Sequence, residues 1–166
     1  MNYTEPHVPI PEDVIPRMLT LAKLTSSDTL FELGAGDGRI VIVAARDFHA
    51  KVVGVEIRKR LALECRRKVK ELGLGDRVRI LRSNFKKVSL RKADVLATYL
   101  SSYTLNLLTP KFESELRTGA RIVNFDYEIP GWKPERELKL TPAGWRTQHS
   151  VYLYSVGKHG IPSSDL

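Results

Sequence analysis

The sequence predicts an α/β fold, a three-layer sandwich in which helices cover both faces of a mostly parallel sheet. Short apolar runs alternate with amphipathic helical segments through the first 125 residues, the pattern of parallel strands joined by crossover helices. The last two apolar runs, 135–140 and 150–157, have no helical segment between them. Two strands joined without a crossover helix must be antiparallel, so this pair predicts a C-terminal hairpin. The expected sheet therefore has seven strands.

The parallel part of the sheet is expected to hold five strands, each a short, largely apolar run. These are residues 29–33, 51–56, 77–81, 93–99 and 120–125. Helices are expected from near residue 13, after the turn at 34–38, over 58–72, in a short piece at 101–108, and from a separate start at Thr109–Pro110. The proline-rich residues 1–11 read as an extended arm, 12–157 as a single domain and 158–166 as a loose tail.

Composition narrows the class of protein. The chain of 166 residues has a net charge of +8 and a pI of about 9.7. No apolar run is long enough to cross a membrane, and the N-terminus does not have the pattern of a signal peptide. A single cysteine fits a reducing cytoplasm, where we expect the protein to act. The many charged residues are also typical of a thermophile. The basic charge indicates either a solvated surface or an anionic partner.

The first strand leads into a turn with three alternate glycines, Gly34, Gly36 and Gly38. Glycines let the backbone bend tightly and approach a ligand closely. The spacing differs from the G-x-G-x-x-G of dinucleotide sites, and Asp37 would repel a phosphate at the following helix N-terminus. Glu32 and Asp37 suit a cationic ligand with a free amino group instead. The turn thus predicts a nucleoside ligand without phosphate.

Two further strand ends carry groups that suit an adenosyl ligand. Glu56 ends the second strand, where a carboxylate can accept both ribose hydroxyls. We expect the partner of Glu56 to be ligand and not protein. Asn84 and Phe85 end the third strand and can flank an adenine ring by its edge and its face. S-adenosylmethionine has adenine, ribose, a sulfonium, an ammonium and no phosphate, so it fits these groups.

The run Glu32–Gly38, E-L-G-A-G-D-G, resembles the first motif of seven-strand S-adenosylmethionine-dependent methyltransferases. Glu56 matches their second-strand acid, and the strand order matches their Rossmann-like sheet. The resemblance covers about residues 12–157. The cofactor-binding residues it implies are Glu32, Gly34, Gly36, Asp37, Gly38, Glu56, Ile57, Asn84, Phe85, Tyr99 and Leu100.

Two sequence features of enzymes that methylate nucleic-acid bases are missing from this chain, which restricts the groups it is expected to methylate. Cytosine C5 methylation needs a thiolate after the fourth strand, but Cys65 falls on the apolar face of a helix and is expected in the core. Adenine N6 enzymes typically carry an N/D-P-P-Y/F run after that strand, and this chain has Thr98–Tyr103, T-Y-L-S-S-Y, there. Both base-modifying reactions are therefore disfavoured.

A finer resemblance extends beyond the cofactor motifs. P-H-V-P near the N-terminus, G-V-E-I, Val123–Trp132 (V-N-F-D-Y-E-I-P-G-W) and H-S-V-Y-L-Y are together similar to small archaeal broad-specificity protein-lysine methyltransferases. This resemblance implies protein substrates with exposed lysines and, with no appended recognition domain expected, loose specificity. The arm is shorter than the family form, so whether it covers the cofactor stays open.

Aromatic side chains after the fourth and fifth strands are the candidates for the acceptor site. Tyr99 and Tyr103 are expected to line an amine channel, and Asp126, Tyr127 and Trp132 its rim. The four histidines show no metal-ligand spacing, so no metal is expected. Two alternatives stay open: an RNA or small-molecule methyltransferase whose basic surface holds a phosphate backbone, and a non-catalytic module that binds S-adenosylmethionine. Nucleic acid is thus a less favoured partner than protein.

Overall fold

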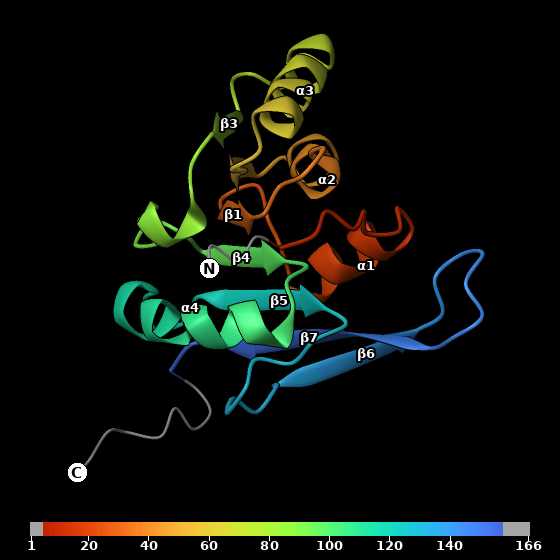
Figure 1. Cartoon of the computed structure of the whole chain (residues 1–166), viewed down its shortest axis with the longest axis vertical. Coiled ribbons are helices and arrows are strands. Elements are labelled where there is room, and N and C mark those ends of the chain that lie inside the picture. The colour runs from red at the N-terminus through yellow and green to blue at the C-terminus, as the bar shows by residue number, and fades with distance from the viewer. Residues whose placement is uncertain (1–4, 158–166) are drawn as a thin grey trace.

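The computed structural model describes residues 5–157. In this part of the chain seven strands form one sheet with helices on both faces (Figure 1). The strands are β1 (Thr29–Leu33), β2 (Lys51–Val55), β3 (Val78–Leu81), β4 (Val95–Thr98), β5 (Arg121–Phe125), β6 (Arg136–Leu140) and β7 (His149–Ser155). The helices are α1 (Val14–Leu21), α2 (Arg39–Asp47), α3 (Lys59–Glu71) and α4 (Ser102–Glu115), with a 3-10 turn η1 (Phe85–Lys87).

The strand order across the sheet is β3-β2-β1-β4-β5-β7-β6. Strands β1 to β5 pair in parallel, whereas β7 is antiparallel to both β5 and β6. This confirms the predicted Rossmann-like sheet with its antiparallel C-terminal hairpin strand. The chain direction across the sheet reverses between β1 and β4, and ligands of open α/β sheets bind outside the strand ends at such a point.

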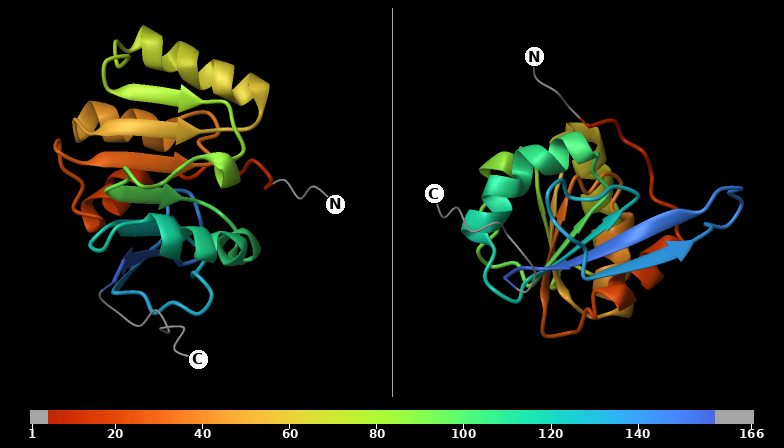
Figure 2. Two further views of the ribbon diagram at one scale, coloured as in Figure 1. Left: turned by 90° about the vertical axis from the view of Figure 1, so that its left-hand side faces the viewer. Right: turned by 90° about the horizontal axis from the view of Figure 1, so that it is seen from below.

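Two separate hydrophobic cores hold the sheet between its helices. Helices α1, α2 and α3 pack on one face, and α4 packs on the other (Figure 2). Each helix buries one apolar stripe against the sheet, and the central strands β1, β4 and β5 are mostly buried, as expected for strands covered on both faces. The hairpin β6–β7 extends away from the helices at the edge of the sheet (Figure 1).

One predicted boundary is wrong. The sequence predicted a helix break at Thr109–Pro110, but α4 runs through both residues as one helix. The buried stripe of Leu105, Leu108 and Phe112 continues past the proline. Pro110 has no amide hydrogen, so the carbonyl of Asn106 lacks the donor that it would have in a regular helix. Both residues are exposed. Water can reach that carbonyl, so the cost of the missing hydrogen bond is small compared with the burial of the stripe.

The other predicted helices and strands agree with the structure to within about two residues at their ends, the usual scatter of such boundaries. The predicted C-terminal tail, 158–166, lies outside the described residues. None of the described helices has the length and apolar composition needed to cross a membrane.

Candidate cofactor and acceptor site

The glycine turn joins the carboxyl ends of β1 and β2 through main-chain hydrogen bonds. The amides of Gly34 and Ala35 both donate to the carbonyl of Val55, at 2.9 Å each. Gly34 and Gly36 have φ of +80° and +56°, a left-handed backbone that favours glycine. A cleft lies beside this turn, between the ends of β2 and β4 and residues 5–10 of the arm. It occupies the switch point of the sheet.

Glu56 lies under the glycine turn and is only 3% exposed. Its Oε2 accepts from the amide of Gly36 at 2.9 Å, and its Oε1 accepts from the amide of Arg58 at 2.8 Å. The expectation that its partner would be ligand alone is therefore wrong, because the turn folds back over the end of β2. A carboxylate has about four acceptor sites, so Glu56 keeps capacity for hydroxyl donors in the cleft.

Glu32 is a buried carboxylic acid that accepts a main-chain hydrogen bond and lies near two other acids. Its Oε2 accepts from the amide of Val41 at 3.1 Å, which satisfies one of the unpaired amides in the first turn of α2. Burial raises the pKa of Glu32 well above its usual range; the hydrogen bond from Val41 lowers it, and the charges of Asp37 and Glu56 raise it further. A positively charged ligand group beside Glu32 would relieve this destabilisation.

The carboxylate of Asp37 forms ion pairs with two basic side chains of the protein itself. Its Oδ2 lies 3.1 Å from Arg39 Nε and 3.5 Å from Lys68 Nζ. Burial acts to raise the pKa of Asp37, but the hydrogen bond from Arg39 and the charges of Lys68 and Arg39 outweigh it, so the pKa is lowered. Asp37 lines the cleft, yet its charge is largely neutralised, so Glu32 is the stronger candidate for a ligand ammonium.

The described part of the N-terminal arm lies across this cleft. Glu5 Oε1 accepts from both the amide and the hydroxyl of Ser101, at 2.8 and 2.6 Å, and the Arg58 guanidinium donates to the Glu5 carbonyl. The ring of His7 sits against the turn, because a Cβ added to Gly36 would lie 2.7 Å from His7 Cε1. Residues 5–10 therefore lie over the glycine turn and line the cleft.

A second group of side chains, which we term the acceptor rim, lies where β4, β5 and β7 meet: Tyr99, Asp126, Tyr127 and His149. Tyr99 lines the cleft, and its ring stacks on Tyr127 at a centroid distance of 6.5 Å. Burial raises the pKa of Tyr99 to about 12, with the charge of Asp126, Tyr127 and a hydrogen bond to Asp126 adding to the effect. Tyr99 therefore stays protonated near neutral pH and joins the cleft to the rim.

Asp126 is held by His149. Its Oδ1 lies 2.6 Å from His149 Nδ1, and the other ring nitrogen of His149 lies 2.8 Å from the hydroxyl of Thr147. Asp126 also has a φ of +71°, a conformation that costs a non-glycine residue about 1–3 kcal/mol and is common at functional sites. Sequence reasoning missed His149, since its partner precedes it by 23 residues.

Asn124 fixes the loops that carry the rim. It is completely buried, and its Oδ1 accepts from the Thr98 hydroxyl at 2.5 Å and from the amide of Leu100 at 3.2 Å. Its Nδ2 donates to the carbonyl of Tyr127 at 2.6 Å and to that of Phe125 at 3.2 Å. The residue was missed in the sequence, although an asparagine within the apolar strand R-I-V-N-F is a signal that could have identified it.

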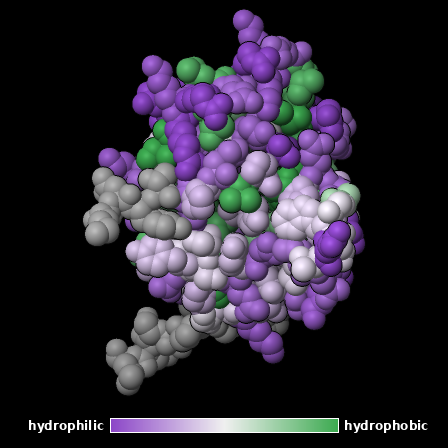
Figure 3. All heavy atoms as spheres, turned by 45° about the vertical axis from the view of Figure 1, so that its right-hand side comes forward, coloured by the Kyte–Doolittle hydropathy of each residue, from purple (hydrophilic) through white to green (hydrophobic). Residues whose placement is uncertain are grey.

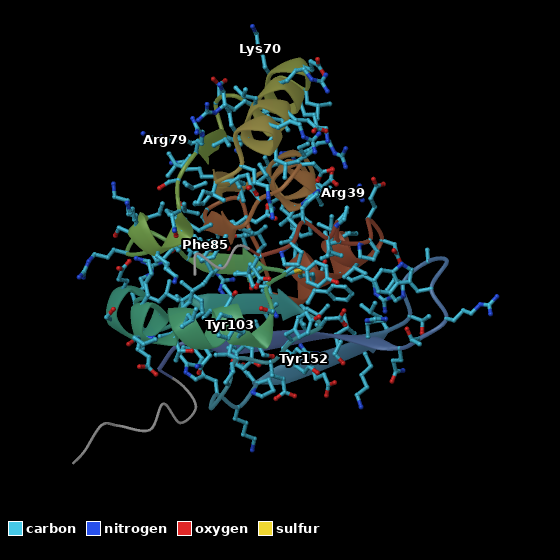
Figure 4. All side chains as sticks on the ribbon, viewed as in Figure 1. Arg39, Lys70, Arg79, Phe85, Tyr103 and Tyr152 are labelled. Carbon is cyan, nitrogen blue, oxygen red and sulfur yellow. The ribbon has the colours of Figure 1, made fainter. Side chains whose placement is uncertain are left out.

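Two of the predicted acceptor residues lie elsewhere. Trp132 packs its ring against Phe112 and Tyr154, at centroid distances of 6.5 and 6.1 Å, so it belongs to the core beneath α4 and not to the rim. Tyr103 is 58% exposed on α4 and does not line the cleft (Figure 4). Both lie on the α4 side of the sheet, Tyr103 on the helix itself and Trp132 in the loop between β5 and β6 that packs against the core beneath α4.

Comparison with known proteins identifies the family of this chain. A family profile described as the ANTKMT methyltransferase domain matches residues 32–136, the span that carries the glycine turn, Glu56 and most of the rim. The chain belongs to this methyltransferase family. It is also 40% identical over 155 residues to a protein-lysine N-methyltransferase of Saccharolobus islandicus, an alignment that covers 93% of this chain and 95% of that one.

Two other relatives of this methyltransferase are informative. It is 33% identical over 105 residues to the adenine nucleotide translocase lysine N-methyltransferase of the mouse, and it spans 46% of that protein. It is also 33% identical to a solved structure described as an RNA methyltransferase from Salinibacter ruber in complex with S-adenosyl-L-homocysteine. That match has a TM-score of 0.87 and covers 96% of this chain and all of the other.

The predicted cofactor residues of the methyltransferase fall into two groups. One group lines the cleft: Glu32, Gly34, Gly36, Asp37, Glu56, Tyr99 and Leu100. The donor set fits S-adenosylmethionine, the cofactor of this family, because it places carboxylates where an ammonium and ribose hydroxyls need acceptors and glycines where a backbone must approach closely. The ring of His7 in the arm also lies too close for a Cβ at Gly36.

The other group does not line the cleft: Gly38, Ile57, Asn84 and Phe85. A Cβ at Gly38 would lie 2.4 Å from Cys65 Sγ, so Gly38 is needed for the packing of α3 on the start of α2. Asn84 accepts from the amide of Lys86 and begins η1. Cys65 is fully buried, as predicted, and burial raises the pKa of its thiol to about 12.

Proposed function

We propose that this methyltransferase transfers methyl groups to lysine side chains of many proteins. The observation that carries the proposal is the acceptor rim, which presents an acid and aromatic rings beside the cofactor cleft. A lysine ammonium is attracted by Asp126, and its alkyl chain is suited to the faces of Tyr99 and Tyr127. The protein-lysine N-methyltransferase from Saccharolobus supports this assignment over almost its full length.

The cofactor-binding roles follow from the cleft. Glu32 would hold the ammonium of the cofactor, Glu56 its ribose hydroxyls, and the backbone at Gly34 and Gly36 would allow close approach. When bound, S-adenosylmethionine supplies an electrophilic methyl group. Asn84 and Phe85 remain candidates for the adenine, since η1 follows the end of β3 at the same edge of the sheet (Figure 4).

The task of the rim is to present a neutral amine in line with that methyl group. A lysine has a pKa of about 10.4, so neutralising it at pH 7 costs roughly 4–5 kcal/mol. Partial desolvation between the rings of Tyr99 and Tyr127 lowers that cost. Asp126 is the carboxylate of the rim and would take up the proton, with His149 orienting it through Oδ1. Alignment of the amine is the larger contribution of such a site.

Broad specificity fits the exposure of the rim. Tyr127 is 42% exposed and lies at the mouth of the site, so a lysine can enter from the surface of a folded protein without a peptide groove. Selection would then depend on how far a lysine protrudes and not on the sequence around it.

The test is a transfer assay with tritiated S-adenosylmethionine on unfractionated protein and on RNA, with lysine-acetylated protein as the matched control. We expect label in the protein fraction that disappears after acetylation. The variant Asp126→Asn should lower kcat by about a hundredfold to ten-thousandfold while cofactor affinity stays unchanged. Label that survives acetylation would refute lysine as the acceptor.

RNA is the second candidate acceptor. The Salinibacter relative, which is as similar to this chain as the mouse enzyme, is described as an RNA methyltransferase. In the same assay, label in RNA that is lost in the Asp126→Asn variant would establish this function in place of the first.

A further inference from the structure

The positive charge of the chain is concentrated in one segment. Residues 58–87, which contain α3, β3 and η1, hold 12 Lys and Arg against 3 Asp and Glu, a net charge of +9. The remaining 136 residues hold 15 Lys and Arg against 16 Asp and Glu. The excess charge of +8 therefore comes entirely from one edge of the molecule and is not a general property of its surface.

These cations converge on the free edge of the sheet. Lys59, Arg66 and Lys70 are spaced by seven and four residues and so share one face of α3. That face lies beside β3, because the guanidinium of Arg66 donates to the carbonyl of Ile80 at 2.9 Å. Arg79 extends from β3 itself. Figure 4 shows Lys70 and Arg79 pointing away from the sheet.

The row continues past the end of β3. Arg82 follows the strand, and Lys86 and Lys87 lie in η1. All of these side chains are exposed. We call the whole set the basic edge: Lys59, Arg66, Lys70, Arg79, Arg82, Lys86 and Lys87. Hydrophilic residues also cover much of the surface at the end of the molecule that carries α3 (Figure 3).

No carboxylate of residues 5–157 lies within salt-bridge distance of any member of the basic edge. The other face of α3 is different, since Arg60 and Lys68 both pair with Glu64. The face of α3 with Lys59, Arg66 and Lys70 thus has no carboxylate, whereas Glu64 on the other face is paired with basic side chains. Edge strands are often protected by one charged residue, but a strand of four residues does not need seven cations for that purpose.

We propose that the basic edge binds the phosphodiester backbone of nucleic acid. Interfaces with proteins are depleted in lysine and have an apolar centre, whereas interfaces with nucleic acid are polar and strongly positive. Four of the seven members are lysines, and the rest are arginines. From Lys59 to Lys70 the helix advances about 16 Å at 1.5 Å per residue, which corresponds to about five base pairs of a duplex.

The basic edge lies away from the acceptor rim. Strand β3 forms one edge of the sheet, and three strands separate it from β5, which Asp126 follows. Nucleic acid on this edge would leave the rim open to a protein, so it would localise the enzyme and not serve as the methyl acceptor. The inference does not depend on the identity of the acceptor.

The experiment is fluorescence anisotropy with a labelled 20-base-pair DNA duplex and with a labelled single-stranded RNA, titrated with the full chain at several salt concentrations. With about five phosphates neutralised, log K for the duplex should fall with log salt at a slope of about −4 to −5. The combined variant Lys70→Gln, Arg79→Gln, Arg82→Gln and Lys87→Gln should weaken binding at least tenfold and reduce the slope by about 3–4.

The matched control removes four exposed cations from the hairpin region instead: Lys133→Gln, Arg136→Gln, Lys139→Gln and Arg146→Gln. Both variants lower the net charge by the same amount, so the control should change affinity less than about threefold.

Comparable losses in the two variants, no binding at low salt, or equal binding to polyglutamate would each overturn the proposal. Cofactor affinity and melting temperature of both variants should match the parent chain, which distinguishes lost phosphate contacts from misfolding. Binding of only DNA or only RNA would support the proposal and identify the source of the phosphates.

Discussion

The change Gly38→Ala tests whether this glycine contacts the cofactor or serves the packing of two helices. Gly38 has a φ of +88°, and a left-handed conformation costs an alanine about 1–2 kcal/mol. The added Cβ would also lie 2.4 Å from the sulfur of Cys65, which is fully buried and has little space to rotate away. Overpacking of this kind costs about 1–3 kcal/mol. The total loss in the free energy of unfolding should be about 2–5 kcal/mol.

The two contributions can be separated with Cys65→Ala as a second change. Removing the sulfur leaves Cys65 Cβ, 3.3 Å from the new methyl group, as the nearest atom. In this background Gly38→Ala should cost only the conformational part, about 1–2 kcal/mol. The coupling between the two changes should therefore be about 1–3 kcal/mol, with the double variant more stable than additivity predicts.

The assay is urea unfolding of the four proteins at one pH, with calorimetric titration of S-adenosylmethionine alongside. Each variant should keep the parent m value, because the surface exposed on unfolding hardly changes. Cofactor affinity should be weakened in Gly38→Ala and largely recovered in the double variant. If Gly38→Ala costs the same in both backgrounds, to within about 0.5 kcal/mol, the clash with Cys65 is not its cause and the reasoning fails.

Three more predictions concern the carboxylates and the amide of the site. Glu56→Ala should destabilise the fold by about 2–4 kcal/mol in urea unfolding as well as weaken cofactor binding, since it leaves the amides of Gly36 and Arg58 without their acceptor; an unchanged midpoint would contradict these contacts. The raised pKa of Glu32 means that the folded state holds this proton more tightly than the unfolded state, so stability should fall as pH rises between the usual and the raised value. Glu32→Gln should remove that decline in urea midpoints measured from pH 4 upward, and a decline of the same size in the variant would point to other groups. Asn124→Ala should cost about 2–4 kcal/mol and lower kcat, because the loops after β4 and β5 lose their shared partner; full activity with reduced stability would limit Asn124 to a structural role.

Most of the fold could be predicted because it depends on local patterns. Alternating apolar runs and helical stripes identified every strand, and the missing helix between the last two runs identified the hairpin. The wrong boundary at Pro110 arose because a local rule competed with tertiary burial. The rule treats proline as a helix start, whereas the buried stripe through Phe112 favours continuing the helix.

The site could be predicted only in part. The carboxylates Glu32, Asp37 and Glu56 were identified from their places at strand ends, but not their partners within the protein. Two backbone amides hold Glu56, one amide holds Glu32, and two cations hold Asp37. The rim residue His149 carried no local signal at all.

The sequence by itself determined the class of fold, the glycine turn and the residue types from which a cofactor cleft is built, because these follow from short-range periodicity and backbone conformation. Only the tertiary structure decided which of them share a site. The turn after β1 comes to lie on Glu56 because the parallel strands β1 and β2 end at the same edge of the sheet. Asp126, which follows β5, meets His149, the first residue of β7, because these two strands are antiparallel. Contacts between segments so far apart in the chain depend on strand order and register, which local pattern does not encode.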